Sequence, residues 1–395
     1  MKLSPQQQTA FDTIMKWHAG DEKTFTLAGY AGTGKTTLAK EIAAAIDPEL
    51  TIFCAYTGKA AYVLKEKGCE TAGTLHHHLY ALADHDKSIL KKLEKEIVDA
   101  REKGDAAQVK AFINLLEQKR AEFRKPRFGL NTDSAINHAP LVIVDEYSML
   151  PKELIDDLEK MGKKILYLGD PFQLPPVKGE CPLTPDLFIT EIHRQALESP
   201  IIRAATDVRE GRNLKYCIED GFKYQPKRAI DPEEYKNADQ IIVGRNNTRS
   251  LWNGRFRTLN GVDPLALPQI GEKMICLKNE PFLELFNGLI GNVTYDALDG
   301  IGKEYYMLDF EDHKSLPVYY GDIQGKSHLY DGYSEAHKKL QRFDFAYAIT
   351  CHKAQGSEFD NCLIYNEPIG KDEMRRRWLY TAITRGKNSV TLVEP

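Results

Sequence analysis

The sequence predicts an α/β protein built on parallel β-sheets, and three segments carry that prediction. Residues 24–28 are rich in β-branched and aromatic side chains, as strands are, and they lead through a glycine-rich loop into an alanine-rich helical segment at 37–46. Residues 141–144 and 164–168 read as strands, the first of them wholly apolar, and acidic residues follow each run closely. Ligands bind at the carboxyl ends of parallel strands, so these loops and acids should share one site.

Composition limits the protein class. A chain of 395 residues predicts two to four domains, and 42% hydrophobic residues are typical of a soluble globular protein. No apolar run is long enough for a membrane span, and the N-terminus does not resemble a signal peptide. The seven scattered cysteines predict a reducing compartment, the cytoplasm, or the host cytoplasm for a phage-encoded protein. A net charge of −4 means that any nucleic-acid binding must use a local basic groove.

The glycine-rich segment, residues 29–36, fits the phosphate-loop pattern G-x-x-x-x-G-K-[ST] completely. Its backbone N–H groups should converge on the phosphates of ATP. Lys35 should reach the β- and γ-phosphates, and the Thr36 hydroxyl should bind Mg²⁺. A chance match in a glycine-rich turn is the alternative, but a strand and a helix flank this loop correctly. The other residues expected to bind the nucleotide are Gly32, Thr33, Gly34 and Thr37.

Two acids and a glutamine should complete this site. Asp145 should hold Mg²⁺ through water, and Glu146 should orient or deprotonate the attacking water. Gln173 lies three positions beyond Asp170, in a loop stiffened by prolines, where its amide could sense the γ-phosphate. The alternatives are solvated acids at a strand end and an ordinary loop glutamine.

Further motif-like segments extend from residue 3 to residue 387. In chain order they are 3–7, 56–61, 74–76, 144–149, 169–173, 191–195, 348–359 and 379–387. In content and order they resemble superfamily 1 helicases, in particular those of the RecD/Dda type. The long composite motifs near the C-terminus are the specific ones, and the early segments are weak when taken alone.

This resemblance implies further nucleotide contacts. Gln7 would read the adenine edge, and His193 either lies against the base or does not reach it. Arg194 and Arg385 would approach the γ-phosphate from a second domain, with structural salt bridges as the alternative for each. A guanidinium delivered in this way stabilises charge in the transition state and accelerates hydrolysis by about 10³–10⁵.

The resemblance also implies contacts to single-stranded DNA. Thr57, Lys59 and His76 would provide them from the first motor domain. Thr350, His352 and Glu358 would do so from the second. Tracking along a strand requires polar groups on phosphates and flat groups under bases, but the stacking aromatics cannot be chosen from the sequence.

The predicted architecture is two RecA-like P-loop motor domains, each with an insertion. The first motor domain comprises 1–78 and 129–189, its helical hairpin insertion 79–128, the second motor domain 190–270 and 341–395, and its SH3-like β insertion 271–340. In the first insertion, apolar residues recur at helical spacing on both sides of Gly104–Asp105. We expect that hairpin to be a solvated structural arm. The alternative is a functional role as a wedge, a DNA clamp or an arm that docks a partner. In the second, short strands are followed by a helix at 335–340, and 343–349 returns to the motor sheet.

These features predict an ATP-dependent DNA helicase that uses Mg–ATP and translocates on single-stranded DNA. The resemblance implies 5′-to-3′ movement. Expected partners are single-stranded DNA, forked or tailed duplex DNA, and single-stranded-DNA-binding or replication proteins, and the chain is expected to be a monomer without a membrane partner. The alternatives are a translocase that remodels protein–DNA complexes, the motor subunit of a nuclease or recombination complex, and a P-loop kinase.

Overall fold

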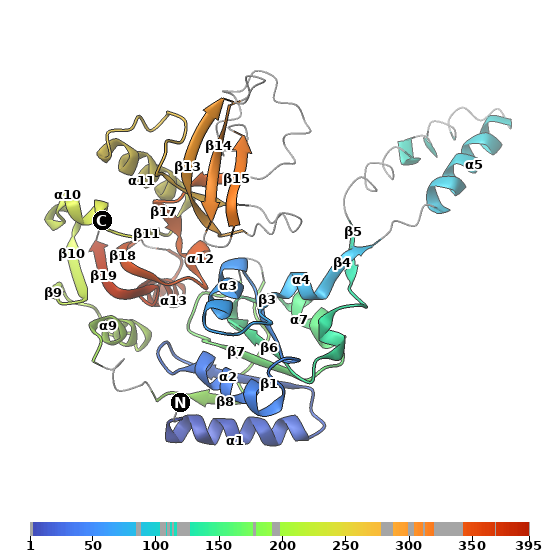
Figure 1. Cartoon of the computed structure of the whole chain (residues 1–395), viewed down its shortest axis with the longest axis horizontal. Helices are drawn as coiled ribbons and strands as arrows, with labels where there is room; N and C mark the ends of the chain where they lie inside the picture. Colours follow the sequence, from blue (N-terminus) through green and yellow to red (C-terminus); the bar gives the residue numbers. More distant parts are fainter. Residues whose placement is uncertain are drawn as a thin grey trace. The chain divides into compact units, whose positions relative to one another are not determined.

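The computed structural model describes residues 3–394. The exceptions are residues 84–87, 103–107, 109–110, 113, 117–126, 177–178, 192–197, 278–286, 299–303, 311–312, 320–342 and 368. The chain divides into two compact units. One comprises Met1–Leu75 and His138–Pro395, and the other comprises His76–Asn137. The first unit contains both parallel sheets and, with them, the candidate site (Figure 1).

The first sheet has six strands, and all of its pairings are parallel. In spatial order they are β3 (Gly73–Thr74), β2 (Ile52–Ala55), β6 (Val142–Asp145), β7 (Ile165–Gly169), β1 (Thr24–Gly29) and β8 (Leu187–Ile189). The helices of this region are α1 (Pro5–Ala19), α2 (Lys35–Ile46), α3 (Gly58–Glu66) and α7 (Lys152–Glu159), with the short 3₁₀ turn η2 (Tyr147–Met149). The three strands predicted at 24–28, 141–144 and 164–168 are confirmed as β1, β6 and β7. Their carboxyl ends lie at one edge, because neighbouring strands run parallel.

Helix α1 is capped at its N-terminus and packs against the first sheet. Ser4 and Gln7 form a reciprocal capping box, in which each side chain bonds the other residue's backbone N–H. Pro5 fits the first helical position because no N–H is needed there. Ala10, Ile14 and Trp17 recur at helical spacing and are buried in the core of the first sheet.

The second sheet also has six strands. In spatial order they are β17 (Ala348–Thr350), β11 (Gln240–Val243), β18 (Phe359–Tyr365), β19 (Gly386–Glu394), β10 (Phe222–Pro226) and β9 (Cys217–Glu219). All pairings are parallel except that of β9 with β10. The helices of this region are α9 (Pro200–Arg209), α10 (Pro232–Lys236), α11 (Asn246–Leu259), α12 (Cys351–Ala354) and α13 (Asp372–Ile383), with the 3₁₀ turn η3 (Lys227–Ala229). Two parallel sheets with associated helices confirm the predicted α/β fold class.

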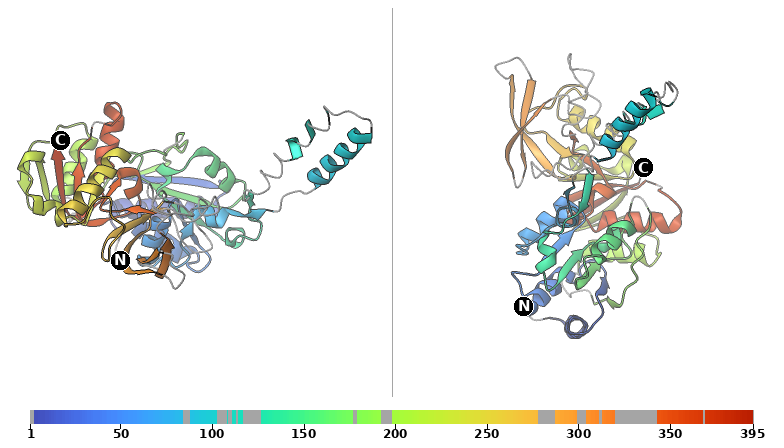
Figure 2. Two further views of the ribbon diagram at one scale, coloured as in Figure 1. Left: turned by 90° about the horizontal axis from the view of Figure 1, so that it is seen from above. Right: turned by 90° about the vertical axis from the view of Figure 1, so that its right-hand side faces the viewer.

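A five-stranded antiparallel sheet interrupts the second parallel sheet in sequence. Its spatial order is β15 (His313–Tyr319), β14 (Glu304–Phe310), β13 (Ile290–Leu298), β12 (Lys273–Cys276) and β16 (Phe343–Phe345). Strands β13, β14 and β15 are the orange arrows in Figures 1 and 2. The short strands predicted here are present, whereas the helix predicted at 335–340 lies outside the described residues.

One sequence prediction in this region is wrong. Residues 343–349 were expected to return to the second motor sheet as one segment. Instead β16 pairs with β12 in the antiparallel sheet, and the parallel sheet resumes only at β17. Phe343 and Phe345 both point into the small core of the antiparallel sheet, which determines where this strand pairs.

The second unit contains α4 (Leu75–Leu79), the two-stranded sheet of β4 (Tyr80–Ala83) and β5 (Arg127–Leu130), α5 (Ser88–Glu102) and the 3₁₀ turn η1 (Ala135–His138). The end residues Leu75 of α4 and His138 of η1 belong to the first unit. Residues 111–112 and 114–116 are helical as well. Phe112 and Leu116 pack with Leu93 and Ile97 of α5, so helical segments from both sides of the predicted break share a small core. The break itself, Gly104–Asp105, lies outside the described residues.

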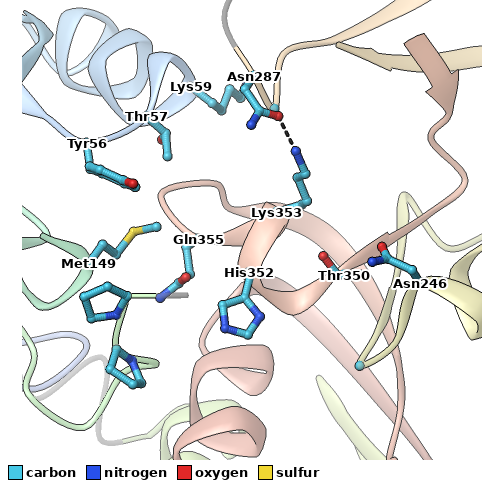
Figure 3. Close-up of a pocket in the computed structure, with 14 residues that line it drawn as sticks. Tyr56, Thr57, Lys59, Met149, Asn246, Asn287, Thr350, His352, Lys353 and Gln355 are labelled. Carbon is cyan, nitrogen blue, oxygen red and sulfur yellow. Dashed lines mark hydrogen bonds between the residues drawn. The ribbon is translucent and has the colours of Figure 1, made fainter. Parts of the chain in front are cut away.

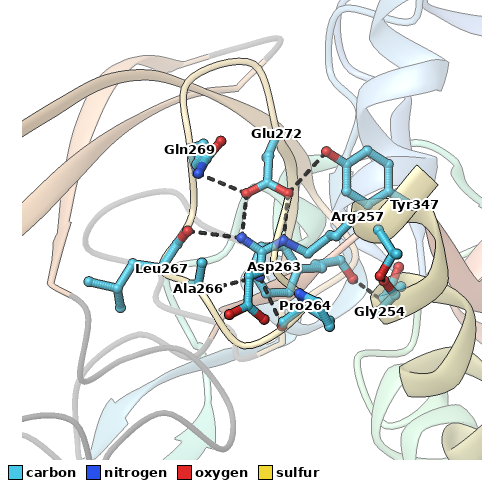
Figure 4. A network of polar contacts seen from close by, with 12 residues as sticks. Gly254, Arg257, Asp263, Pro264, Ala266, Leu267, Gln269, Glu272 and Tyr347 are labelled. Carbon is cyan, nitrogen blue, oxygen red and sulfur yellow. Dashed lines mark hydrogen bonds and ion pairs between the residues drawn. The ribbon is translucent and has the colours of Figure 1, made fainter. Parts of the chain in front are cut away.

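A buried ion pair joins the second parallel sheet to the antiparallel sheet (Figure 4). Arg257 near the end of α11 bonds both carboxylate oxygens of Glu272, just before β12, at 2.7 and 3.0 Å. Its other N–H groups donate to the carbonyl oxygens of Pro264, Ala266 and Leu267, so all five guanidinium donors are used. Glu272 also accepts from the Tyr347 hydroxyl. A fully satisfied buried pair of this kind holds the two sheets in a defined arrangement.

Among the described residues, no helix combines the length and the apolar character needed to cross a bilayer.

Replacing Arg257 should destabilise the fold strongly. Arg257→Met leaves the Glu272 carboxylate buried without its cation, which typically costs about 3–5 kcal/mol in the free energy of unfolding. Equilibrium denaturation with urea would measure it. Arg203→Met is the matched control, because Arg203 pairs with Glu219 at 2.7 Å on the surface. Such exposed pairs contribute about 0–1 kcal/mol, so equal losses in the two variants would contradict the role given to the buried pair.

Candidate nucleotide and nucleic-acid sites

The phosphate loop connects β1 to α2 and has the backbone that its sequence predicts. Gly34 is left-handed, with φ +72°, immediately before the first residue of α2, Lys35. A side chain is strained in that conformation, which explains the glycine. The Lys35 ammonium donates to the carbonyl oxygens of Gly29 and Tyr30 at 2.7 and 2.9 Å. The loop therefore presents a helix N-terminus and a lysine on one side, the arrangement that binds anions.

A pocket of about 510 Å³ opens over this loop and takes residues from both parallel sheets. The predicted residues that line it are Gly32, Gly34, Lys35, Thr36, Thr37, Asp145, Glu146, Gln173, Glu358 and Arg385. Of the predicted phosphate-loop residues only Thr33 faces elsewhere. It is buried, its hydroxyl donates to the carbonyl of Tyr30, and its own carbonyl accepts from Gln7. The structure thus brings most of the predicted nucleotide site together.

Asp145 is the last residue of β6 and lines this pocket. Burial, followed by the charge of Glu146, raises the pKa of the Asp145 carboxyl to about 6, while Lys35 opposes the shift. The backbone of Glu146 is left-handed, with φ +57°, and is the only such non-glycine residue among those described. Strain of this kind persists where the surroundings impose it, often at functional sites. One Glu146 carboxylate oxygen, Oε2, is buried and has no hydrogen-bond partner among the described residues.

Gln173 lies in the loop after β7 and is almost completely buried. Its side-chain oxygen has no hydrogen-bond partner among the described residues, yet the residue lines the pocket. Buried polar atoms are nearly always satisfied, so an unpaired amide oxygen beside a phosphate loop points to a bound partner. An ordinary loop glutamine would face solvent.

Arg385 reaches the same pocket from the loop after α13. Its guanidinium donates to the carbonyl oxygens of Thr381 and Ser357 and to the Thr384 hydroxyl, at 3.2 to 3.3 Å. No described carboxylate forms an ion pair with it, so the described contacts do not support the structural salt bridge considered above. A buried cation held only by neutral groups is suited to an anionic ligand.

A magnesium ion fits the donor set of this pocket. The Thr36 hydroxyl and the Asp145 carboxylate both line it, and the buried unpaired Glu146 oxygen lies beside them. The described residues contain no cluster of three or more acidic, histidine or cysteine side chains that would enclose an ion. Magnesium at nucleotide sites is usually held by one or two protein oxygens together with phosphates and water, so such a cluster is not needed.

Of the two predicted adenine contacts, Gln7 and His193, only Gln7 lies among the described residues. Gln7 uses both ends of its amide inside the protein, accepting from the Ser4 backbone and donating to the Thr33 carbonyl at 3.0 Å. It therefore ties α1 to the phosphate loop, and its contact with adenine stays a prediction. His193 and Arg194 lie outside the described residues.

A second pocket lies between the two parallel sheets (Figure 3). From the first sheet's side it is lined by Tyr56, Thr57, Lys59, Met149, Pro175 and Pro176, and from the second by Gly244, Asn246, Thr350, His352, Lys353 and Gln355. Asn287 and Gly288, just before β13 of the antiparallel sheet, complete the lining of this pocket. We call it the polar groove. Four predicted DNA contacts, Thr57, Lys59, Thr350 and His352, therefore meet in one place although they are nearly 300 residues apart in sequence.

The groove has the chemistry that a single strand needs. Lys59 and Lys353 supply cations, and Tyr56 supplies a flat ring. Burial lowers the pKa of His352, which favours a neutral ring at pH 7. The sequence did not predict five of the residues that line the groove, which are Tyr56, Asn246, Asn287, Lys353 and Gln355. Tyr56 and Lys353 adjoin predicted contacts and could have been found, whereas Asn287 is brought to the groove only by folding.

Two predicted DNA contacts are not in this groove. Glu358 lines the nucleotide pocket instead, and its carboxylate lies 3.9 Å from the Lys67 ammonium just after α3. Its prediction as a DNA contact does not match this position, because the loop before β18 directs it to the phosphate side. His76 belongs to the second unit, in α4, where its ring lies 5.8 Å from that of Tyr80. Its contact with DNA stays a prediction.

Comparisons with known proteins identify two matching protein families and several related helicases. The AAA domain family matches residues 2–221, and the UvrD-like helicase C-terminal domain matches residues 345–393. The chain is 26% identical to the ATP-dependent RecD2 DNA helicase of Deinococcus radiodurans, over 98% of this chain and 48% of the relative. It is 22% identical to the ATP-dependent DNA helicase Pif1 of Bdellovibrio bacteriovorus, over 91% of this chain and 81% of the relative. The chain thus spans about half the length of the RecD2 relative.

Solved structures share the fold at low sequence identity. Pif1 helicase from Bacteroides in complex with ADP-AlF3 and single-stranded DNA superposes with a TM-score of 0.56 and 16% identity, over 99% of this chain and 92% of that one. Pif1 helicase from Candida albicans gives a TM-score of 0.54 at 16% identity, over 100% and 95%. These likenesses support the two-domain α/β fold.

Gly356 should be essential for the contact between the two sheets. It has φ +74°, and a Cβ there would lie 2.6 Å from the Cβ of Ala60 and 3.2 Å from the Thr57 hydroxyl. Gly356→Ala should lower the free energy of unfolding by about 1–2 kcal/mol for the left-handed backbone and about 1–3 kcal/mol more for the clash. Gly261→Ala is the control, since Gly261 has φ +76° but open space around it. Denaturation curves that coincide for the two variants would show that no clash occurs.

Proposed function

The chain belongs to the AAA domain family and groups with superfamily 1 helicases of the RecD/Pif1 type, and we propose that it is an ATP-dependent DNA helicase. It would translocate on single-stranded DNA and unwind duplex, driven by Mg–ATP hydrolysis between its two parallel sheets. One observation carries this proposal. The residues Lys35, Glu146 and Gln173 of the first sheet line one pocket together with Arg385 of the second, so closure of the sheets completes the site.

Each side chain has a role that its position supports. Lys35 and the loop amides bind the β- and γ-phosphates. A magnesium ion held by Thr36 and Asp145 would neutralise phosphate charge. Glu146, with its unpaired buried oxygen, orients the attacking water and accepts its proton. Arg385 stabilises the charge that develops on the transferred phosphoryl group.

The polar groove supports single-stranded DNA as the second ligand. It combines cations, amides and a ring from both sheets, so a change in the distance between the sheets alters its grip. The loop that contributes Gln173 to the nucleotide pocket continues directly into Pro175 and Pro176, which line the groove. ATP binding and strand binding are thus connected through one short segment. The RecD-type resemblance favours 5′-to-3′ movement.

We propose a monomer that acts on forked or tailed duplex, with single-stranded-DNA-binding or replication proteins as partners, in a reducing cytoplasm. The described cysteines are all free thiols, which is in keeping with that compartment. A motor subunit of a larger nuclease or recombination assembly is the second candidate. Copurification of a nuclease partner would favour it.

ATP hydrolysis by the purified chain should rise strongly when saturating single-stranded DNA is added. Lys35→Ala should abolish the stimulated rate, because the phosphates lose their cation. Lys160→Ala, which alters an exposed lysine after α7, is the control and should behave as wild type. Duplexes with a 5′ or a 3′ tail then test polarity. A folded Lys35→Ala protein that unwinds tailed duplex at the wild-type rate would refute the proposal.

Single-strand affinity should depend on the groove lysines in a salt-sensitive way. Each phosphate contact that is lost lowers the slope of log affinity against log salt by about 0.7 for a single strand. Lys59→Ala and Lys353→Ala should each weaken binding and reduce this slope, as fluorescence anisotropy at several salt concentrations would show. Lys387→Ala serves as the control, because Lys387 pairs with Asp360 outside the groove. Unchanged slopes in both groove variants would place the strand elsewhere.

A further inference from the structure

Tyr380 on α13 connects the second sheet to two separate loops of the first. Its hydroxyl oxygen accepts from the backbone N–H of Ala31, in the phosphate loop, at 3.1 Å. The same hydroxyl donates to the Oδ2 atom of Asp170, after β7. Tyr380 is almost completely buried and Asp170 completely so. One hydroxyl therefore holds the phosphate loop and the Gln173 loop at a common point.

Burial and the neighbouring charge of Asp170 keep the Tyr380 hydroxyl protonated. Burial, and then the negative charge of Asp170, raise the pKa of Tyr380 well above its usual value. Burial also raises the pKa of Asp170, while Lys35 and the bond from Tyr380 oppose that shift. Close by, the guanidinium of Arg209 on α9 stacks 3.5 Å from the ring centre of Tyr30, the residue before Ala31. The phosphate loop is thus contacted by two helices of the second sheet.

Helix α13, which carries Tyr380, also positions Gln173 and Arg385. The Leu174 N–H donates to the Thr381 hydroxyl at 2.9 Å, so Tyr380 and Thr381 hold both ends of the segment Asp170–Leu174. Gln173 lies within that segment. The Thr381 carbonyl in turn accepts from the Arg385 guanidinium at 3.2 Å. A movement of Tyr380 therefore displaces the residues that approach the γ-phosphate from both sheets.

Tyr380 itself is not among the residues that line the nucleotide pocket. We propose that its hydroxyl is a positioning group for ATP hydrolysis, which holds the phosphate loop, Gln173 and Arg385 in register when the two sheets are together. This inference rests on the proposed ATPase function. It assigns Tyr380 an effect on the rate of the chemical step and not on nucleotide affinity. Misplacement of catalytic groups by about 1 Å can cost about 100-fold in rate.

Tyr380→Phe tests this directly, because it keeps the buried ring and removes only the hydroxyl. In the chain of 395 residues with saturating single-stranded DNA, we expect kcat for ATP hydrolysis to fall by about 10- to 100-fold. KM for ATP should stay within about threefold, since the phosphate contacts remain. Tyr224→Phe is the matched control. The Tyr224 hydroxyl donates to the Glu394 carboxylate at 2.6 Å within the second sheet. The control variant therefore loses the same kind of hydrogen bond, but away from the interface between the two parallel sheets.

Thr381→Val provides a second variant for the same segment, because it removes the acceptor for Leu174 and preserves the size of the side chain. We expect it to lower kcat too, and the double variant to lose less than the product of the single losses, because both changes release one loop. Thermal unfolding of each variant should match that of Tyr224→Phe to within the usual effect of one lost hydrogen bond.

Three outcomes would overturn the inference. They are a kcat for Tyr380→Phe within twofold of wild type, a rise in KM with kcat unchanged, and an equal loss of kcat in Tyr224→Phe. A wild-type protein that hydrolyses no ATP, with or without DNA, would refute the proposed function itself. Wild-type hydrolysis with an unaffected Tyr380→Phe would refute only the positioning role.

Discussion

The arrangement of this protein depends on contacts that join the two parallel sheets at the candidate nucleotide pocket. The first sheet carries the phosphate loop and the acids, and the second carries Arg385. Between them lies the segment Asp170–Leu174, bonded by Tyr380 and Thr381 of α13 and, through the Leu174 carbonyl, by Gln355. Neither sheet has a complete site alone. The geometry of the proposed hydrolysis site is therefore decided at the interface between the sheets.

The same segment also relates the two ligand sites to each other. Gln173 faces the nucleotide pocket, while Pro175 and Pro176 face the polar groove a few residues later. The Gln355 side chain donates to Leu174 from the groove side. Prolines limit how far such a segment can bend, so a displacement at one end is passed to the other. This is a short physical route between nucleotide state and strand contact, made of bonds that can be broken one at a time.

The interactions between sheets differ in strength according to what they join. Arg257 and Glu272 form a buried, fully hydrogen-bonded pair that holds the antiparallel sheet to the second parallel sheet. Lys67 and Glu358, which face each other across the nucleotide pocket, are half exposed and 3.9 Å apart. Exposed pairs of this kind contribute about 0–1 kcal/mol. The antiparallel sheet is thus held by a buried ion pair, whereas the two parallel sheets are joined by the buried hydrogen bonds of Tyr380, Thr381 and Gln355 and by this weak exposed pair.

The sequence by itself determined the fold class, the phosphate loop, the strand-end acids and the general position of the second motor sheet. These follow from local chemistry. A glycine-rich turn between strand and helix, or an apolar run ending in acids, has nearly the same structure wherever it occurs. Only the tertiary structure decided that Glu358 faces Lys67 in the nucleotide pocket, that β16 joins the antiparallel sheet, and that Tyr380 bonds Ala31 and Asp170. Those facts depend on which distant residue a side chain meets, and no spacing along the chain specifies that partner.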